Sequence, residues 1–479
     1  MKAQTEENNL VLFNPMPVKH PVAIQNKKTT SLQVPLVNVP LSLLALSRMV
    51  RDDFNVKIFN AVVDSGYKDL ILSECEDALC LAVSSMTCYQ IRDGINVCAA
   101  VKGRRPELPV IWGGYHPSTE PVQTLENPNV DIVIRGQGEL TFKEVVESLR
   151  DKKSLKGIPG VSYKDDSHII NNPDRKFKDI NVFPPIPYDM IDVEKHIKGY
   201  KFGSRCMDYY ISQGCAARCD FCSEPLFCGR HWSGLLPETV ISELEHLSKT
   251  YNIDTFMIRD SDFFLNIKRV KELCELLVKK ELGIRFTSVN GRMEQLARMD
   301  DEVWALIRKA GVHEIFIGFE SGYQDALDAM NKGARVSHIK RCIDKCIKHD
   351  IDVRGSFMVG IPGVEAKEEV KSTLNEIHKI ICAYGERGRL AHMDILLSFF
   401  TPYPRTKLYD IALKNGLKPL NTLEDWGDFD QFDFKAPWFP EEYFNLVREF
   451  RAGMPWNSGC EFKDWCKFYE GIRGKLERM

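Results

Sequence analysis

The stretch GCAARCDFC, residues 214–222, holds three cysteines in a C-x3-C-x2-C spacing. It follows an apolar run, Tyr209–Ser212, which predicts a β-strand. So short a loop can direct the three thiolates of Cys215, Cys219 and Cys222 at one metal centre. Three cysteines are too few for a structural four-cysteine zinc site, and no C-x2-C pair follows at zinc-ribbon spacing. Thiolates suit iron–sulfur clusters, and three ligands on a four-iron cluster leave one iron open.

The other cysteines are interpreted differently. Cys206 and Cys228 flank the motif and are expected to be ordinary buried thiols. A chance group of cysteines and a zinc knuckle remain the alternatives to a cluster. The chain has 15 cysteines, and its first residues, MKAQTEE, are polar and acidic rather than a secretory signal. We therefore expect a reducing, cytoplasmic compartment.

The length and composition of the chain limit which classes of protein it can belong to. The chain has 479 residues, 44% of them hydrophobic and 27% charged. About two to four domains with real cores are expected from this length. The formal net charge of −3 provides no basic field for nucleic acid. No run reaches the roughly 18 uncharged apolar residues that a membrane helix needs, so no transmembrane segment is expected.

Upstream of the motif, short apolar runs alternate with helical patterns. Strands are predicted at residues 10–14, 56–61, 79–84, 109–112 and 131–134, and a helix at 40–51. This order predicts a parallel sheet covered on both faces, with ligands beyond the carboxyl ends of its strands. The Ser-rich loop 84–87 and the Gly-rich turns 113–117 and 135–139 lie at those ends. Each turn alone is weak evidence, because such loops use glycine anyway. A hairpin at 161–170 and a Pro-rich linker at 183–188 follow.

With Phe221 before its last cysteine, the motif resembles the signature of radical S-adenosylmethionine (SAM) enzymes. The resemblance continues along the chain. Asp254–Arg259, Arg285–Val289, Ala310–Gly322, Gly355–Gly363 and Ser398–Thr406 are similar to the second to sixth barrel strands of that family, and helical segments at 237–249, 267–280, 301–309, 337–349 and 365–382 separate them. The resemblance implies a (β/α)6 partial TIM barrel with its chemistry at the carboxyl end.

The first part of the chain resembles the cobalamin-binding domain that precedes the barrel in one branch of this family. The strand order, WGGYHP at 112–117 and RGQGE at 135–139 carry the likeness. Two departures stand out. The nearest string to an axial-histidine motif, DSHIIN at 166–171, ends in Asn and lies in the hairpin, so it is interpreted as a turn. Ser288-Val289-Asn290 replaces the acidic ending of the third barrel strand.

The implied fold is α/β throughout. A Rossmann-like cobalamin-binding domain is expected at 8–165, a hairpin and Pro-rich linker at 166–203, the barrel at 204–415 and a small aromatic-rich region at 416–479. Fourteen aromatic residues between 426 and 469 are expected to close the barrel and shape the substrate pocket, with plain packing or a membrane-associating role as alternatives. Cys460 and Cys466 are poorly spaced for a second cluster.

The resemblance also implies three cofactors. A [4Fe–4S] cluster is expected on the three motif cysteines, SAM on the open iron, and cobalamin on the first domain. Contacts to SAM are expected from Asp260, Asp262, Asn290, Arg292, Glu320 and Gly360. Contacts to the corrin or its nucleotide tail are expected from Ser84, Ser85, Thr87, Gly113, Gly114, His116, Gly136, Gly138 and Glu139. The structural alternatives are a helix cap before Asn266 made by the two aspartates, a pair between Glu320 and Arg292, a rim charge at Arg292 and a turn cap at His116.

In this family SAM cleavage yields a 5′-deoxyadenosyl radical, which removes hydrogen from an unactivated carbon. The sequence therefore predicts a cobalamin-dependent C-methyltransferase, or else a cyclisation, rearrangement or oxidation. A methylthiotransferase would need three more cluster cysteines and a basic RNA module, and a carrier would not need the barrel. No catalytic acid or base is assigned. The substrate is an unidentified small molecule or peptide, no nucleic acid is expected, and a one-electron donor such as flavodoxin or ferredoxin is required.

Overall fold

The computed structural model describes residues 8–17, 37–166, 168–429 and 434–479. The first domain is built on a seven-stranded sheet of order β2-β1-β3-β4-β5-β6-β7. Its first five strands pair in parallel, and β6 and β7 form the predicted antiparallel hairpin. The strands are β1 Asn9–Asn14, β2 Asn55–Asn60, β3 Cys80–Ser84, β4 Val110–Gly113, β5 Ile132–Ile134, β6 Val161–Asp165 and β7 His168–Asn171.

Helices cover both faces of this sheet, as its continuously apolar strands require. One buried cluster lies under α3 and α4, and a second lies under α2 and α7. The DSHIIN string was interpreted as a turn, but its last four residues, His168–Asn171, form β7; residue 167 lies outside the described residues. The helices are α2 Leu41–Ser47, α3 Tyr67–Glu74, α4 Tyr89–Arg104, α5 Tyr115–Thr119, α6 Pro121–Glu126 and α7 Glu139–Arg150.

The barrel follows as two four-stranded sheets, of order β13-β12-β9-β8 and β14-β15-β16-β17. The chain passes from one sheet to the other at Ser288, whose φ of 53° breaks the strand in two. All neighbours pair in parallel except β8 with β9, so six parallel segments result. They are β9 Gly203–Tyr209, β12 Thr255–Ile258, β13 Arg285–Thr287 with β14 Val289–Arg292, β15 Glu314–Glu320, β16 Asp352–Val359 and β17 Met393–Phe399; β8 is Lys198–Tyr200.

Two barrel strands were predicted at the wrong residues. The run before the cysteines ends its strand at Tyr209, and Ser212–Gly214 forms β10, which pairs antiparallel with β11 (Trp232–Gly234). The sixth strand is β17, and most of Ser398–Thr406 is the loop after it. Pro402 and Pro404 explain this, because proline has no N–H to give to the ladder.

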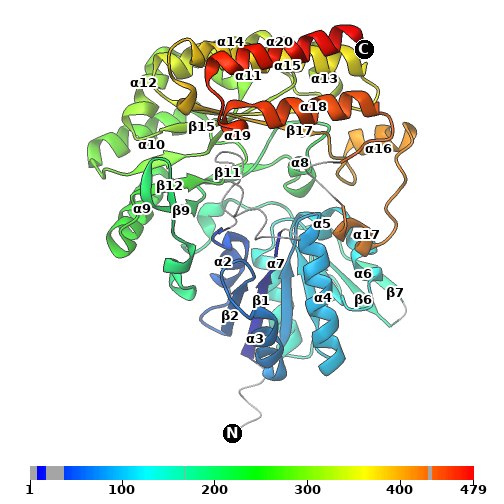
Figure 1. Cartoon of the computed structure of the whole chain (residues 1–479). Helices are drawn as coiled ribbons and strands as arrows, with labels where there is room; N and C mark the ends of the chain where they lie inside the picture. The colour runs from blue at the N-terminus through cyan, green and yellow to red at the C-terminus, as the bar shows by residue number, and fades with distance from the viewer. Residues whose placement is uncertain (1–7, 18–36, 167, 430–433) are drawn as a thin grey trace.

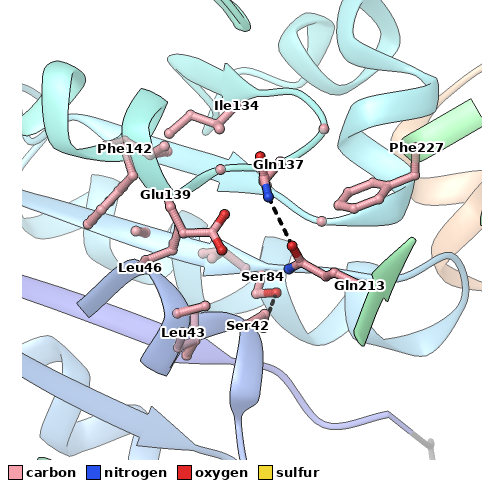
Figure 2. A pocket seen from close by; sticks show the side chains of 18 residues that line it. Ser42, Leu43, Leu46, Ser84, Ile134, Gln137, Glu139, Phe142, Gln213 and Phe227 are labelled. Atoms are coloured by element: carbon pink, nitrogen blue, oxygen red, sulfur yellow. Dashed lines mark hydrogen bonds between the residues drawn. The ribbon is translucent and has the colours of Figure 1, made fainter. Parts of the chain in front are cut away.

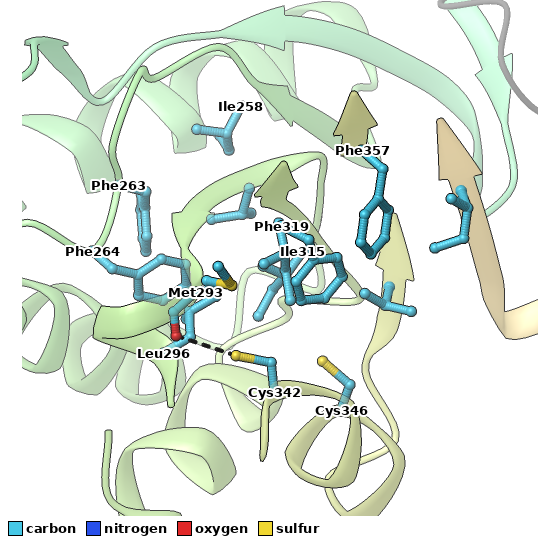
Figure 3. Packing of buried hydrophobic residues seen from close by; sticks show 14 of the residues in the cluster. Ile258, Phe263, Phe264, Met293, Leu296, Ile315, Phe319, Cys342, Cys346 and Phe357 are labelled. Atoms are coloured by element: carbon cyan, nitrogen blue, oxygen red, sulfur yellow. Dashed lines mark hydrogen bonds between the residues drawn. The ribbon is translucent and has the colours of Figure 1, made fainter. Parts of the chain in front are cut away.

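The predicted barrel helices are present, with small shifts at their ends. They are α9 Pro237–Tyr251, α10 Ile267–Lys280, α12 Asp301–Lys309, α14 Ser337–Lys348 and α15 Ala366–Gly385. Four helices were not predicted: α8 Glu224–Phe227, α11 Met293–Leu296, α13 Gln324–Ala329 and α16 Lys407–Lys414. Figure 3 shows the barrel core, where Phe319 and Phe357 lie with ring centroids 5.3 Å apart. The buried thiol of Cys342 donates to the carbonyl of Met293 at 3.3 Å. Cysteines of α14 thus serve packing.

The C-terminal region contacts both larger parts (Figure 1). Its α17 (Leu423–Gly427) packs on α4, and the indole of Trp426 donates to Gln123 Oε1 at 2.7 Å. Its α20 (Phe462–Arg478) packs on α15 and on α18 (Glu441–Gly453), and α19 spans Pro455–Ser458. Cys466 lies beside Cys382 of α15. Within the described ranges, no helix is long and apolar enough to cross a membrane.

Candidate cofactor sites

The cysteine loop lies at the carboxyl ends of the barrel strands and is closed at its base by β10 and β11. Cys215, Cys219 and Cys222 line one cavity, together with residues from the neighbouring strands and loops, among them Glu224, Ser261, Asn290, Arg292, Glu320, Lys332 and Ser356. No three His, Cys, Asp or Glu side chains of the described residues converge on a single ion. Three thiolates that line one cavity fit a four-iron cluster, in which each cysteine binds its own iron.

Charge around the cysteines favours thiolates. Burial raises the pKa of Cys215 to about 11 and that of Cys222 to about 12, so their ionised forms need cationic partners. Arg292 is a cation beside these cysteines: its Nη1 donates to Cys219 Sγ at 3.0 Å, and its charge acts to lower the pKa of Cys215. Cys228 receives the N–H of Cys215 at 3.4 Å and supports the loop without lining the cavity, as expected.

Arg292 and Glu320 both line the cavity but do not pair with each other. Arg292 pairs with Glu294, and its Nη2 donates to the carbonyl of Lys332 at 2.6 Å. Glu320 pairs with the buried ammonium of Lys332 at 2.7 Å and accepts from Ser356 Oγ at 3.3 Å. The alternative of a Glu320–Arg292 pair is therefore wrong. Lys332 was missed, because it lies twelve residues beyond the strand ending in a stretch without a motif.

The side chains of the two aspartates after β12 are turned to other partners. Asp260 accepts from the N–H of Ile211 at 2.7 Å and from Ser212 Oγ at 2.6 Å. Asp262 accepts from Gln295 at 3.0 Å, and burial raises its pKa to about 6. Neither lines the cysteine cavity, whereas Ser261 between them does. The capping alternative is also wrong, because α10 is capped by Asn266 itself.

Asn290 and Gly360 complete the predicted SAM set. Asn290 lines the cavity and donates to the carbonyl of Asp260. Gly360 has φ +87°, a conformation that favours glycine. Its N–H donates to Glu369 at 2.8 Å, and its carbonyl accepts from Trp438 at 2.8 Å. Gly360 lies outside the cavity lining, so its contact with SAM stays a prediction.

The Gly-rich turns of the first domain form a slot (Figure 2). Six of the residues predicted for cobalamin line it: Ser84, Gly113, Gly114, Gly136, Gly138 and Glu139. Leu43, Leu46, Ile134 and Phe142 add an apolar wall that the sequence did not single out. The slot holds about 100 Å³, against about 300–1,000 Å³ for a typical ligand pocket, so it fits part of a ligand.

The remaining predicted cobalamin residues lie behind the slot. Ser85 packs under Gly114, where a Cβ would lie 2.6 Å from its carbonyl oxygen. His116 Nδ1 lies 3.3 Å from Thr87 Oγ1, and the ring packs near Trp426. Burial lowers the pKa of His116 to about 3, so this histidine is neutral. Glu139, which lines the slot itself, forms a buried ion pair with Arg48 at 2.8 Å. Their direct contact with a corrin stays a prediction.

The slot and the cysteine loop adjoin each other. Tyr115, just after β4, donates to the carboxylate of Glu224, two residues beyond the last cysteine. Its ring stacks on Phe227, which lines the slot, with centroids 4.6 Å apart. Gln137 of the second Gly-rich turn donates to Gln213, just before the cysteine loop, at 3.0 Å (Figure 2). The two candidate cofactor sites are thus tied by one side chain from each Gly-rich motif, Tyr115 and Gln137, through contacts that the sequence did not predict.

Comparison with known proteins shows which protein families the chain resembles. The model of the radical SAM superfamily matches residues 209–377, and that of the B12 binding domain matches residues 28–146. An uncharacterized methyltransferase of Pyrococcus horikoshii is 30% identical over 385 residues, 79% of each chain. An anaerobic magnesium-protoporphyrin IX monomethyl ester cyclase of Synechocystis is 23% identical over 74% of this chain and 68% of its own.

Among solved structures, the radical SAM methyltransferase TsrM from Kitasatospora setae, with cobalamin and a [4Fe–4S] cluster bound, superposes with a TM-score of 0.68. It is 17% identical and covers 98% of this chain and 99% of its own, so the likeness is one of fold. The chain belongs to the radical SAM superfamily, in the branch that carries an N-terminal B12-binding domain. Its cofactors are those of the two families: a [4Fe–4S] cluster, SAM and cobalamin.

Proposed function

We propose that this chain is a cobalamin-dependent radical SAM C-methyltransferase. The observation that carries the proposal is the junction of the cysteine cavity and the Gly-rich slot through Tyr115 and Glu224. The likeness to the uncharacterized methyltransferase of Pyrococcus horikoshii supports methyl transfer. When bound, the cofactors supply a carbon-centred radical at the cysteine cavity and a transferable methyl group at the slot.

The residues of this chain position and protect these groups. Arg292, Glu320 and Lys332 place fixed charges around the cysteine cavity, matching the amino and carboxylate groups of SAM. Glycines 113, 114, 136 and 138 let the backbone approach a large ring closely. The C-terminal region covers both parts and excludes water from the space between them. A cluster on Cys215, Cys219 and Cys222 would need a reducing setting, so we place the protein in the cytoplasm.

A non-methylating radical reaction is the second candidate, favoured by the likeness to the magnesium-protoporphyrin cyclase. SAM carrying a deuterated methyl group separates the two without knowledge of the substrate. Anaerobic, reconstituted protein is incubated with this SAM and a strong reductant, and the products are identified by mass spectrometry. Formation of S-adenosylhomocysteine, with the deuterated methyl group transferred to the bound cobalamin, is expected together with 5′-deoxyadenosine. Production of 5′-deoxyadenosine alone, with cobalamin bound, would favour the non-methylating reaction and contradict the proposal.

A further inference from the structure

A second cavity lies against the cysteine loop and opens to the surface of the protein. Cys219 and Cys222 line this outer cavity as well as the inner one described above. The outer cavity shares with the inner one only Pro225 besides these two cysteines. Cys219 and Cys222 therefore separate the inner cavity, where SAM is expected, from the outer cavity at the surface. An electron that enters from outside can therefore reach a cluster through these two cysteines.

The rim of the outer cavity is basic. Four exposed cations surround it: Arg218 and Arg230 from the cysteine loop, and Arg405 and Lys407 from the loop after β17 and the start of α16. Arg405 pairs with Glu120 and Lys407 with Asp220, but the side chains of Arg405 and Lys407 remain 61% and 68% exposed. Neither Arg218 nor Arg230 forms an ion pair with another described residue. The patch is positive although the whole chain carries −3.

An exposed apolar side chain lies within the same ring of charges. Leu226, in α8, is 46% exposed and lines the outer cavity. An apolar contact surrounded by like charges is the usual make-up of a transient protein interface. Electron-transfer interfaces are small and weak, and they rely on charge to raise the rate of encounter. Four cations around one leucine fit this description.

We propose that this surface, defined by Arg218, Leu226, Arg230, Arg405 and Lys407, is the docking site for an acidic one-electron carrier protein that reduces the cluster. The proposal rests on the proposed radical SAM chemistry and adds where its electron enters. Arginines at the rim suit the carboxylates of such a partner, because their guanidinium groups bind them in pairs of hydrogen bonds. The opposite side of the cysteines is left free for SAM.

The test compares two reductants on one reaction, the formation of 5′-deoxyadenosine from SAM. One reductant is an acidic flavodoxin kept reduced by its NADPH-dependent reductase, and the other is dithionite, which needs no docking site. The variant is Arg218→Glu/Arg230→Glu. Its matched control is Lys268→Glu/Lys271→Glu, which makes the same charge change on the exposed face of α10.

With flavodoxin at low salt, we expect the arginine variant to react at least about tenfold more slowly than the control. The dithionite rates of the two variants should be equal, and added salt should slow the wild type while leaving the arginine variant little changed. Equal flavodoxin rates would overturn the docking proposal. If Arg218→Glu/Arg230→Glu loses iron, the test is repeated with Arg405→Gln/Lys407→Gln, whose residues lie outside the cysteine loop. The rates with flavodoxin and with dithionite are then compared in the same way. Failure of the wild type with dithionite would instead contradict the proposed function.

Discussion

The cysteine cavity and the Gly-rich slot are built in opposite ways. In the cavity, long side chains meet each other: Arg292 reaches Cys219, and Lys332 reaches Glu320. In the slot, four glycines bring bare backbone to the surface, and leucine, isoleucine and phenylalanine side chains supply the rest. The one charged slot residue, Glu139, is already neutralised by Arg48.

This difference fits the two ligands. SAM is small and charged, so fixed charges can bind its polar ends from several strands. A corrin is broad and mostly apolar at its edges, so space and backbone matter more than any single side chain. The cavity should therefore be sensitive to loss of a side chain, and the slot to gain of one.

Removal of a cysteine ligand is the strongest way to break the cavity. Cys219→Ala should lose its iron and reduce the formation of 5′-deoxyadenosine to background, because two thiolates cannot hold the cluster. Iron analysis and the anaerobic absorption spectrum check this. Cys228→Ala is the control, since Cys228 contacts the backbone of Cys215 but does not line the cavity. Equal iron loss in both variants would show that packing, rather than ligation, explains the effect.

The next largest effect, on the rate of SAM cleavage, is expected from substitution of Arg292. Arg292→Gln removes the charged donor to Cys219 and one wall of the SAM site. A charge-assisted hydrogen bond contributes about 1.5–3 kcal/mol, so we expect a loss of about ten- to a hundredfold in the rate of SAM cleavage. The rate is measured with dithionite at saturating SAM. Arg292→Lys should recover part of the loss, and the exposed Arg298→Gln should cause none. An unaffected Arg292→Gln would reduce Arg292 to the rim charge of the alternative interpretation.

The sequence predicted some residues of the cysteine cavity and of the Gly-rich slot, but not others. The three cysteines share one short loop, so their spacing alone predicted that they meet. Glycines at strand ends could be placed because parallel strands end at one edge. Lys332, Glu224 and Tyr115 could not be found, because their partners lie in other elements and only the fold brings them together. The backbone around Asp260–Asp262 was assigned to SAM on position; the side chains of the two aspartates accept hydrogen bonds from Ile211, Ser212 and Gln295, and the backbone contact stays a prediction.

A side chain added in the slot should act on cobalamin alone. A Cβ at Gly113 meets only the carbonyl of Ile134 at 3.6 Å and Ile134 Cβ at 4.0 Å, so Gly113→Val should fold and fill the slot. We expect corrinoid binding to weaken about tenfold or more, while iron content and SAM cleavage stay normal. Cobalt analysis and titration with cobalamin measure this. Gly103→Val, in open space on α4, is the control. Unchanged cobalt retention would remove the slot from the cobalamin site.

In the barrel, as in the slot, a glycine exposes its backbone. The residue that holds this glycine, Glu369, should give the smallest effect of the series, a change in how stability depends on pH. Gly360 presents backbone, and the fully buried Glu369 holds it by accepting the N–H groups of Gly360 and Ile361 at 2.8 and 3.3 Å. Burial raises the pKa of Glu369 to about 8, above the value near 4.5 expected in the unfolded chain.

Between these two pKa values the folded state holds a proton that the unfolded state has released, so stability should fall as the pH rises from about 4.5 to about 8. Glu369→Gln cannot titrate and should lack this contribution, while its amide oxygen still accepts a hydrogen bond. We expect the melting temperature of the wild type to fall more than that of the variant between pH 6 and pH 9. Parallel pH dependence in the two proteins would mean that Glu369 keeps its charge, and that the two N–H groups outweigh the cost of burial.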